Sequence, residues 1–202
     1  MRRRAYDAEL TRANIITAAR GLFANKGYTA TSIDEICAVT GYSKGSLYYH
    51  FKSKEDLFVQ LAEEAFLHSW EAWDERSSSY ETTIDKLYAY ADYFVDTLEK
   101  PLNKAGEDFI AKVGLESEVG QKFLAILMGY LARFETLVAE GVSSGEFRHE
   151  NPKELAYILM SYYSGLSDSY RMMDKAAMKQ LYRNATRLIL EGLANPDHEV
   201  KR

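Results

Sequence analysis

Apolar side chains recur at spacings of three and four residues along most of this 202-residue chain, and this periodicity constrains its fold more than any other feature. The first clear example contains Ile15, Ile16, Ala19, Leu22 and Phe23. Only 3 prolines and 12 glycines interrupt the pattern, and no strand-like alternation continues beyond a few residues. The sequence therefore predicts an all-α fold of about nine helices.

Capping residues and helix breakers divide the chain into these helices. We expect Thr31 to cap the second helix, with Asp34 as the acidic partner of a capping box, and Ser43 and Ser53 to cap the third and fourth. Asn151 precedes a proline and is expected to cap the eighth. The expected helices cover approximately residues 7–25, 32–40, 44–51, 54–77, 84–98, 109–113, 119–145, 152–173 and 176–193.

The balance of charge changes near residue 54. Residues 1–54 contain 9 Lys and Arg against 4 Asp and Glu, whereas residues 55–202 contain 16 against 26. A basic N-terminal segment (the head) followed by an acidic remainder (the body) indicates that the head binds a polyanion. Chance clustering of charge, helped by the arginines at positions 2–4, is the alternative. We expect one domain in residues 1–54 and a second in residues 55–202.

Residues 29–58 predict a short helix, a turn at Gly41 and Tyr42, and a second short helix, which is the pattern of a helix-turn-helix. The second helix of that motif enters the major groove of DNA, and its first turn meets base edges. Leu47 and Phe51 lie four residues apart and should face inward, so the polar side chains between them face outward. A short helix with half-buried tyrosines and no DNA partner is the alternative interpretation.

The polar residues of this segment suit DNA. Lys44, Gly45 and Ser46 form the first turn of the second short helix, where a lysine can donate to guanine acceptors and a glycine allows a close approach. We expect contacts with the phosphate backbone from donors that follow this turn and from hydroxyls at the start of the preceding helix. The backbone-contacting set is Thr31, Ser32, Tyr48, Tyr49, His50 and Lys54.

The same segment resembles the DNA-binding domain of the tetracycline-repressor (TetR) family. The matching stretches are AARGLFANKGYTATSIDEIC, TGYSKGSLYYHF and KSKEDLF, within about residues 8–60. The resemblance implies a sequence-specific DNA-binding transcriptional regulator, a repressor that binds a palindromic operator as a homodimer. It also implies that Lys44, Gly45 and Ser46 read bases, and that Ser43 joins the residues that hold the backbone.

A dimer is also expected on physical grounds, because one short helix contacts few base pairs and two half-sites lie about 34–36 Å apart along a duplex. By the resemblance, the last two helices form the dimer seam. The residues assigned to that seam are Leu155, Leu159, Tyr162, Leu166, Leu181 and Leu188. Burial of the same apolar stripes inside one chain is the alternative.

Aromatic side chains make up 13% of the chain and are dense on the expected helices four to seven, between which the TetR family encloses its effector. We expect a small, largely apolar or cationic effector, with Asp92, Asp96 and Glu135 available to neutralise a cation. An ordinary aromatic core is the alternative. The residues assigned to the effector site are Phe66, Trp70, Trp73, Tyr93, Phe94, Phe109, Phe123 and Tyr130.

The sequence favours no other class of protein as strongly. The single cysteine, Cys37, and the four histidines lack metal-ligand spacing, and no glycine-rich phosphate loop is present, so we expect no enzyme activity, metal or cofactor. We see no signal peptide and no apolar run long enough for a membrane helix, and expect a cytoplasmic protein. The rival functions are a ligand-independent DNA-binding regulator and a small-molecule binding protein with a vestigial DNA head.

Overall fold

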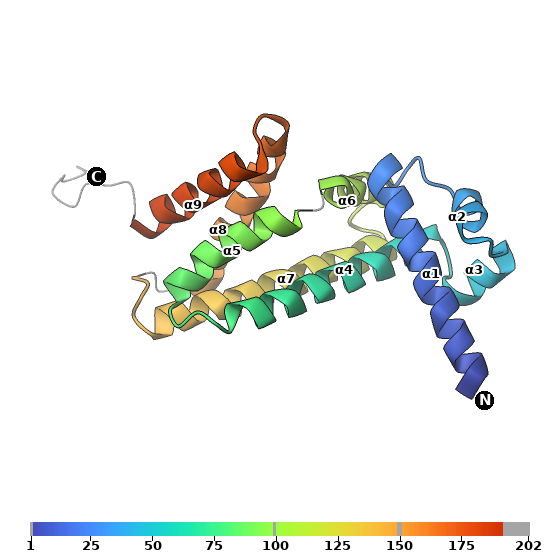
Figure 1. The fold of residues 1–202 in the computed structure, drawn as a ribbon, viewed down its shortest axis with the longest axis horizontal. Helices are drawn as coiled ribbons and strands as arrows, with labels where there is room; N and C mark the ends of the chain where they lie inside the picture. The colour runs from blue at the N-terminus through green and yellow to red at the C-terminus, as the bar shows by residue number, and fades with distance from the viewer. Residues whose placement is uncertain (1, 99, 149–150, 192–202) are drawn as a thin grey trace. The chain divides into compact units, whose positions relative to one another are not determined.

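The computed structural model describes residues 2–98, 100–148 and 151–191, and every regular element in these ranges is a helix (Figure 1). The all-α prediction is confirmed. None of the described helices is long and apolar enough to cross a membrane. The helices are α1 (Arg2–Lys26), α2 (Ile33–Thr40), α3 (Lys44–His50), α4 (Lys54–Ser77), α5 (Thr83–Thr97), α6 (Lys100–Val113), α7 (Glu118–Ser143), α8 (Pro152–Leu166), a 3-10 turn (Ser167–Arg171) and α9 (Lys175–Glu191).

The described residues form two compact units that are discontinuous in sequence. Unit 1 contains those within Met1–His68 and Glu99–Met128, and unit 2 contains those within Ser69–Leu98 and Gly129–Arg202. Helices α4 and α7 therefore each contribute residues to both units. Domains in residues 1–54 and 55–202 stay a prediction, and the compact units add that α6 and the first part of α7 pack with the N-terminal helices.

The core of unit 1 holds α1, α2, α3 and α4 together. Phe23, Tyr28 and Phe58 are buried and have ring centroids 5.1–5.7 Å apart. Leu47 of α3 and Phe51 directly after it are fully buried in the same cluster. The prediction that these two side chains face inward is confirmed, and their burial fixes which face of α3 points outward.

The capping of α2 differs from the prediction by one residue. Ser32 is the N-cap, its hydroxyl accepts from the Glu35 amide, and the Glu35 carboxylate accepts from the Ser32 amide. Thr31 is only 1% exposed and its hydroxyl donates to the Gly27 carbonyl oxygen at 2.8 Å, so it is not available as the cap. The predicted caps of α3 and α4 are confirmed, since Ser43 and Ser53 accept from amides three residues ahead.

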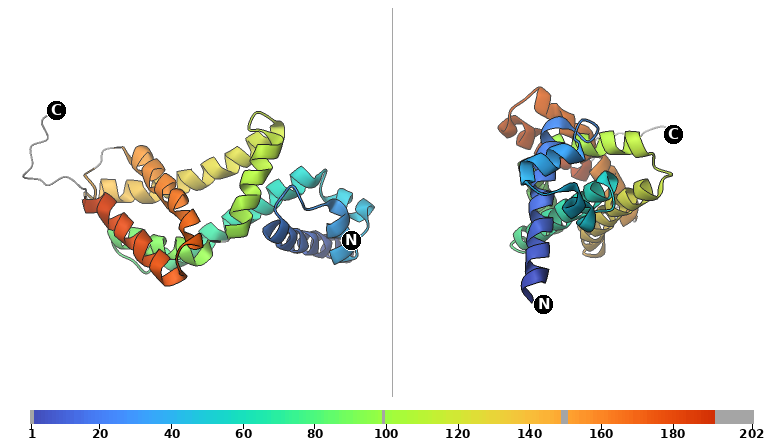
Figure 2. Two further views of the ribbon diagram at one scale, coloured as in Figure 1. Left: turned by 90° about the horizontal axis from the view of Figure 1, so that it is seen from above. Right: turned by 90° about the vertical axis from the view of Figure 1, so that its right-hand side faces the viewer.

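In unit 2, α9 lies along α5 and α8 (Figures 1 and 2). The predicted cap of α8 is confirmed, because the Asn151 side chain accepts from the Glu154 amide. Helix α8 ends at Leu166, seven residues earlier than predicted. The Asp174 carboxylate accepts from the Ala177 amide at 2.8 Å and starts α9, so the chain has to turn before this position. The predicted end of the ninth helix, Leu193, lies outside the described residues.

Candidate nucleic-acid interface

Helix α3 presents a polar outer face because its inner face is fixed in the core of unit 1. Lys44, Gly45 and Tyr48 are exposed, and Tyr49 is 79% exposed. Ser46 and His50 are half-buried at the edges of this face, and the His50 ring meets the Tyr49 ring edge-on at 5.0 Å. Exposed tyrosine hydroxyls and a lysine on a two-turn helix are the groups that contact phosphate oxygens and base edges.

The turn before α3 is built by two residues. Gly41 adopts φ +73°, a left-handed conformation that a side chain would strain, and its amide donates to the Cys37 carbonyl oxygen to end α2. The Ser43 hydroxyl accepts from the Ser46 amide at 3.1 Å and starts α3. Ser43 therefore has a structural role in addition to the backbone contact that the sequence suggested, and its hydroxyl proton is not used by the cap.

Acidic residues of α2 pair with lysines of the two neighbouring helices. The Asp34 carboxylate lies 2.6 Å from the Lys44 ammonium, and both side chains are more than half exposed. The Glu35 carboxylate pairs with Lys26 of α1. Hydrogen bonds from Lys26 and from the Ser32 amide lower the pKa of Glu35 to about 2, although partial desolvation raises it. The sequence assigned Asp34 to the capping box, and the structure gives that position to Glu35.

Lys54, a predicted phosphate contact, has a second interaction inside unit 1. Its ammonium lies 4.2 Å from the centroid of the Tyr28 ring, and partial burial lowers the pKa of Lys54. The Tyr28 hydroxyl donates to the Glu55 carboxylate at 3.1 Å. Lys54 therefore also stabilises the start of α4 through a cation–π contact.

Not every predicted backbone contact reaches the surface. Ser32 is exposed at the N-terminus of α2. Thr31 is buried with its hydroxyl bonded to Gly27, so the Thr31 side chain is not available to a phosphate. The structure adds a contact of Tyr42 in the predicted turn, where its hydroxyl accepts from the Asn14 side chain at 3.1 Å. That contact joins residues 28 positions apart, and no local sequence signal indicates it.

The aromatic residues assigned to the effector site divide between the two units. Trp70, Trp73, Tyr93, Phe94 and Tyr130 belong to unit 2. Phe109 and Phe123 do not, because both are buried in unit 1, where Phe109 packs on Tyr28 and Phe58 at 5.0 and 4.8 Å. Phe66 also belongs to unit 1 and is half-buried. The sequence assigned all eight rings to one effector site, with an aromatic core as the alternative, and could not identify the unit that each ring enters.

The rings of unit 2 pack against one another around Tyr90. Its ring centroid lies 5.0 Å from that of Trp73 and 4.9 Å from that of Phe134, and its hydroxyl is 2.6 Å from the Tyr130 hydroxyl. Burial strongly raises the pKa of Tyr90, so this hydroxyl stays protonated. A groove of about 410 Å³ borders this cluster. Its lining residues are Trp70, Trp73, Asp74, Ser77, Lys86, Arg133, Thr136, Leu137 and Glu140.

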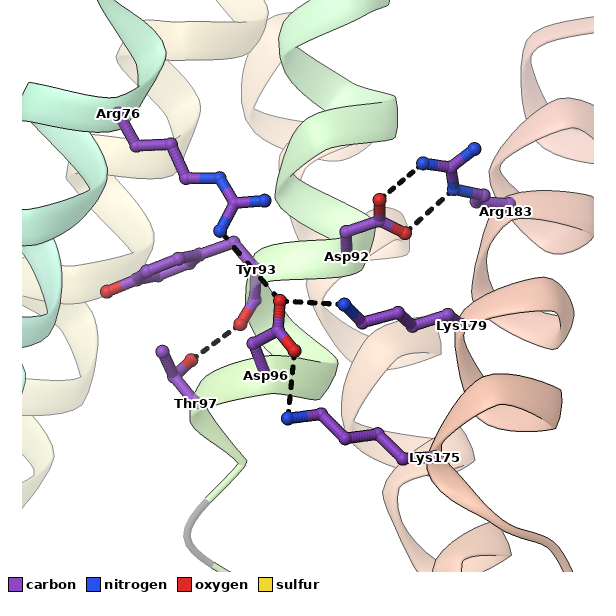
Figure 3. A network of polar contacts seen from close by, with 8 residues as sticks. All are labelled: Arg76, Asp92, Tyr93, Asp96, Thr97, Lys175, Lys179 and Arg183. Carbon is purple, nitrogen blue, oxygen red and sulfur yellow. Dashed lines mark hydrogen bonds and ion pairs between the residues drawn. The ribbon is translucent and has the colours of Figure 1, made fainter.

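Asp92 and Asp96 have cationic partners within the protein (Figure 3). Asp92 accepts two hydrogen bonds from the Arg183 guanidinium. Asp96 lies 2.8 Å from the ammonium groups of both Lys175 and Lys179. Partial desolvation raises the pKa of Asp96, but the hydrogen bonds from these lysines lower it overall. The expectation that Asp92 and Asp96 neutralise a bound cation is therefore not supported, because α9 already supplies their partners, whereas the same expectation for Glu135 stays a prediction.

The residues assigned to the dimer seam differ in accessibility. Leu159 is fully buried and Leu155 is 8% exposed, so both pack inside their own chain and are not available to a second copy. Tyr162, Leu166 and Leu181 are half-buried. Leu188 on α9 is exposed, as are Tyr157 and Ile158 on α8. The described part of α8 and α9 thus retains accessible apolar side chains, although the set differs from the predicted one.

Two family models match the chain. One, described as the C-terminal region of QacR-like proteins, matches residues 67–195, and the other, described as bacterial regulatory proteins of the tetR family, matches residues 15–61. The chain is 25% identical over 181 residues to the HTH-type transcriptional regulator QacR of Staphylococcus aureus, which covers 89% of this chain and 96% of the relative.

Solved structures share the fold. A TetR-family transcriptional regulator from Syntrophomonas wolfei superposes with a TM-score of 0.77 at 18% identity and covers 94% of this chain and 99% of its own. FadR from Bacillus subtilis, solved in complex with stearoyl-CoA, gives a TM-score of 0.70 at 22% identity over 90% of this chain and 99% of its own. At these identities the similarity establishes the arrangement of helices.

Proposed function

Since the chain belongs to the tetR family of bacterial regulatory proteins and is a DNA-binding transcriptional regulator, we propose that it represses its target by binding a palindromic operator as a homodimer. The observation that carries this proposal is the outward polar face of α3, which Leu47 and Phe51 orient from the core. Lys44, Gly45 and Ser46 read bases in the major groove. We further propose that the protein acts in the cytoplasm, where its operator lies.

The backbone of the operator is held by donors around α3. Tyr48, Tyr49 and His50 lie on α3, and Ser32, Ser43 and Lys54 lie at the adjoining helix ends. These contacts carry no sequence information, but they set the register in which Lys44 meets the bases. Thr31 is left out of the proposed interface because it is buried.

The homodimer doubles the reading surface. One copy of α3 spans only a few base pairs, and two copies separated by one duplex repeat of about 34–36 Å read a palindrome. We propose that the accessible apolar residues of α8 and α9 form the seam, with Tyr157 and Ile158 beside the predicted Tyr162, Leu166, Leu181 and Leu188. An isologous seam of this kind closes at two copies.

A small-molecule effector releases the protein from DNA. The relative FadR was solved with stearoyl-CoA, and the aromatic rings of unit 2 offer a largely apolar environment to a ligand of this chain. Because Asp92 and Asp96 are already paired, we favour an apolar effector over a cationic one. An effector that prefers the DNA-free state weakens DNA binding, and operator DNA weakens effector binding equally, with a coupling free energy of about 1–3 kcal/mol.

The test of DNA reading compares three lysine variants on duplexes selected from a randomised pool and on random DNA. Lys44→Ala is expected to lower the preference for the selected site. Lys54→Ala is expected to weaken binding to both duplexes alike and to lower the salt slope by about one unit per subunit. Lys104→Ala on α6 is the control, because Lys104 is an exposed lysine of unit 1 outside the proposed interface. Equal loss on both duplexes for Lys44→Ala would remove this residue from the reading set.

Two rival functions give different outcomes. A small-molecule binding protein with a vestigial head selects no duplex from the pool. A ligand-independent regulator selects a duplex, but no compound from a broad library shifts its melting temperature. The proposed function requires a selected palindrome and a compound that binds the free protein more tightly than the DNA complex.

A further inference from the structure

The carboxylate of Asp34 lies on the proposed DNA-reading surface, 2.6 Å from the ammonium of Lys44. The Asp34 side chain is 71% exposed and that of Lys44 is 58% exposed, so the pair faces solvent. Asp34 does not take part in the capping of α2, which Ser32 and Glu35 perform. The carboxylate is therefore held beside Lys44 without a role in closing the helix.

Stability explains only part of this carboxylate's placement, since a negative charge in the first turn of α2 interacts favourably with the helix dipole. An exposed ion pair contributes little to folding, since the side chains lose entropy and water screens their charges. A negative charge on a surface that approaches DNA also repels phosphate groups, and it pairs with a lysine that would otherwise neutralise a phosphate. Asp34 is therefore expected to weaken non-specific binding, and a contact between Asp34 and a base in the specific complex would compensate for this loss.

The two side chains together offer neighbouring donor and acceptor groups. The major-groove edge of a G·C pair presents, in order, the guanine N7 and O6 acceptors and the cytosine N4 amino donor. Lys44 can face the two adjacent acceptors while Asp34 faces the donor. An A·T pair instead places its amino donor between the adenine N7 and thymine O4 acceptors, so a carboxylate there meets an acceptor on either side.

We propose that Asp34 is a specificity-determining residue that reads one G·C pair in each half-site together with Lys44, which donates to guanine while the Asp34 carboxylate accepts from cytosine N4. This inference rests on the proposed function, because it requires α3 to enter the major groove. It assigns base reading to a residue of α2, whereas the recognition helix alone supplies the reading set deduced from sequence.

The experiment compares the full-length protein with Asp34→Ala. Glu118→Ala is the matched control, because Glu118 also pairs with an exposed lysine, Lys122, at 2.7 Å, and lies in unit 1 outside the proposed interface. The wild-type protein first selects duplexes from a randomised pool. Affinities are then measured for the selected duplex, for variants with each base pair replaced in turn, and for poly(dA-dT) over a range of KCl concentrations.

For the wild-type protein and the control, replacing one particular G·C pair in both half-sites by A·T is expected to weaken binding at least ten-fold. For Asp34→Ala the same replacement is expected to weaken binding by less than about three-fold, while the preferences at the other base pairs of the site stay unchanged. The variant is also expected to bind poly(dA-dT) several-fold more tightly, with a salt slope steeper by about one unit per subunit, because Lys44 becomes available to phosphate.

The outcomes separate the inference from the proposed function. If the wild-type protein selects no duplex, the proposed function fails. If it selects a palindrome and Asp34→Ala retains the same preference at every position, or loses affinity equally at all of them, the inference is overturned and the proposed function stands. A thermal melt of Asp34→Ala within a few degrees of wild type shows that the comparison uses folded protein.

Discussion

Three buried hydroxyl groups in unit 2 form linked hydrogen bonds, and the direction of one bond decides which of two substitutions costs more stability. The Tyr182 hydroxyl donates to the Tyr163 carbonyl oxygen at 2.7 Å, and the Thr186 hydroxyl donates to the Tyr182 carbonyl oxygen at 2.9 Å. The Tyr163 hydroxyl lies 3.0 Å from the Thr186 oxygen. Because the single proton of Thr186 is already used, Tyr163 is the donor in this contact.

The two isosteric substitutions therefore have unequal costs. Tyr163→Phe removes one neutral hydrogen bond and leaves the Thr186 donor satisfied, which should lower the free energy of unfolding by about 1 kcal/mol. Thr186→Val leaves the buried Tyr163 hydroxyl with only the Leu87 carbonyl oxygen at 3.5 Å. An unsatisfied buried donor costs about 1–3 kcal/mol, so Thr186→Val should lower the free energy of unfolding by about 2 kcal/mol.

The double variant gives the sharpest test. With Tyr163→Phe added, Thr186→Val no longer leaves an unpaired donor, so the double variant should be more stable than Thr186→Val alone. Urea unfolding at one fixed protein concentration measures all four proteins, because subunit association contributes to apparent stability. The reasoning is refuted if Thr186→Val costs no more than Tyr163→Phe, or if the double variant is the least stable of the four.

Two further predictions concern other positions. Gly120→Ala should destabilise unit 1 by about 1–2 kcal/mol, because the added Cβ would lie 2.1 Å from the Gly114 carbonyl oxygen. On the same helix, the Cβ added by Gly129→Ala meets nothing within 4 Å, so this variant should be more stable by up to about 1 kcal/mol. Urea unfolding measures both variants. Glu146 accepts from two amides at the start of α5, and these bonds lower its pKa although desolvation raises it. The stabilisation of the folded state by Glu146 should be present above the unfolded pKa near 4.5 and disappear as pH falls through the lower folded pKa. Glu146→Gln should therefore lower the free energy of unfolding at pH 7 and leave it unchanged in strongly acidic solution. An equal effect at both pH values would contradict this.

Much of the candidate interface could be predicted from sequence because it depends on neighbours within a few residues. The caps at Ser43, Ser53 and Asn151 are local hydrogen bonds, and the outward face of α3 follows from the four-residue spacing of Leu47 and Phe51. The charge excess near the N-terminus and the motif of two short helices are equally local. These features need no knowledge of the distant chain.

Contacts between distant segments decided the rest. The shift of the α2 cap from Thr31 to Ser32 is an exception, because the Thr31 hydroxyl donates to the Gly27 carbonyl oxygen only four residues away. Spacing marks Phe109 as buried, but only packing places it with Tyr28 in unit 1. Sequence thus determined which residues form helices and which faces are apolar, since both follow from the helical period. Tertiary structure determined which faces meet, because partners far apart in the sequence leave no trace in a local pattern.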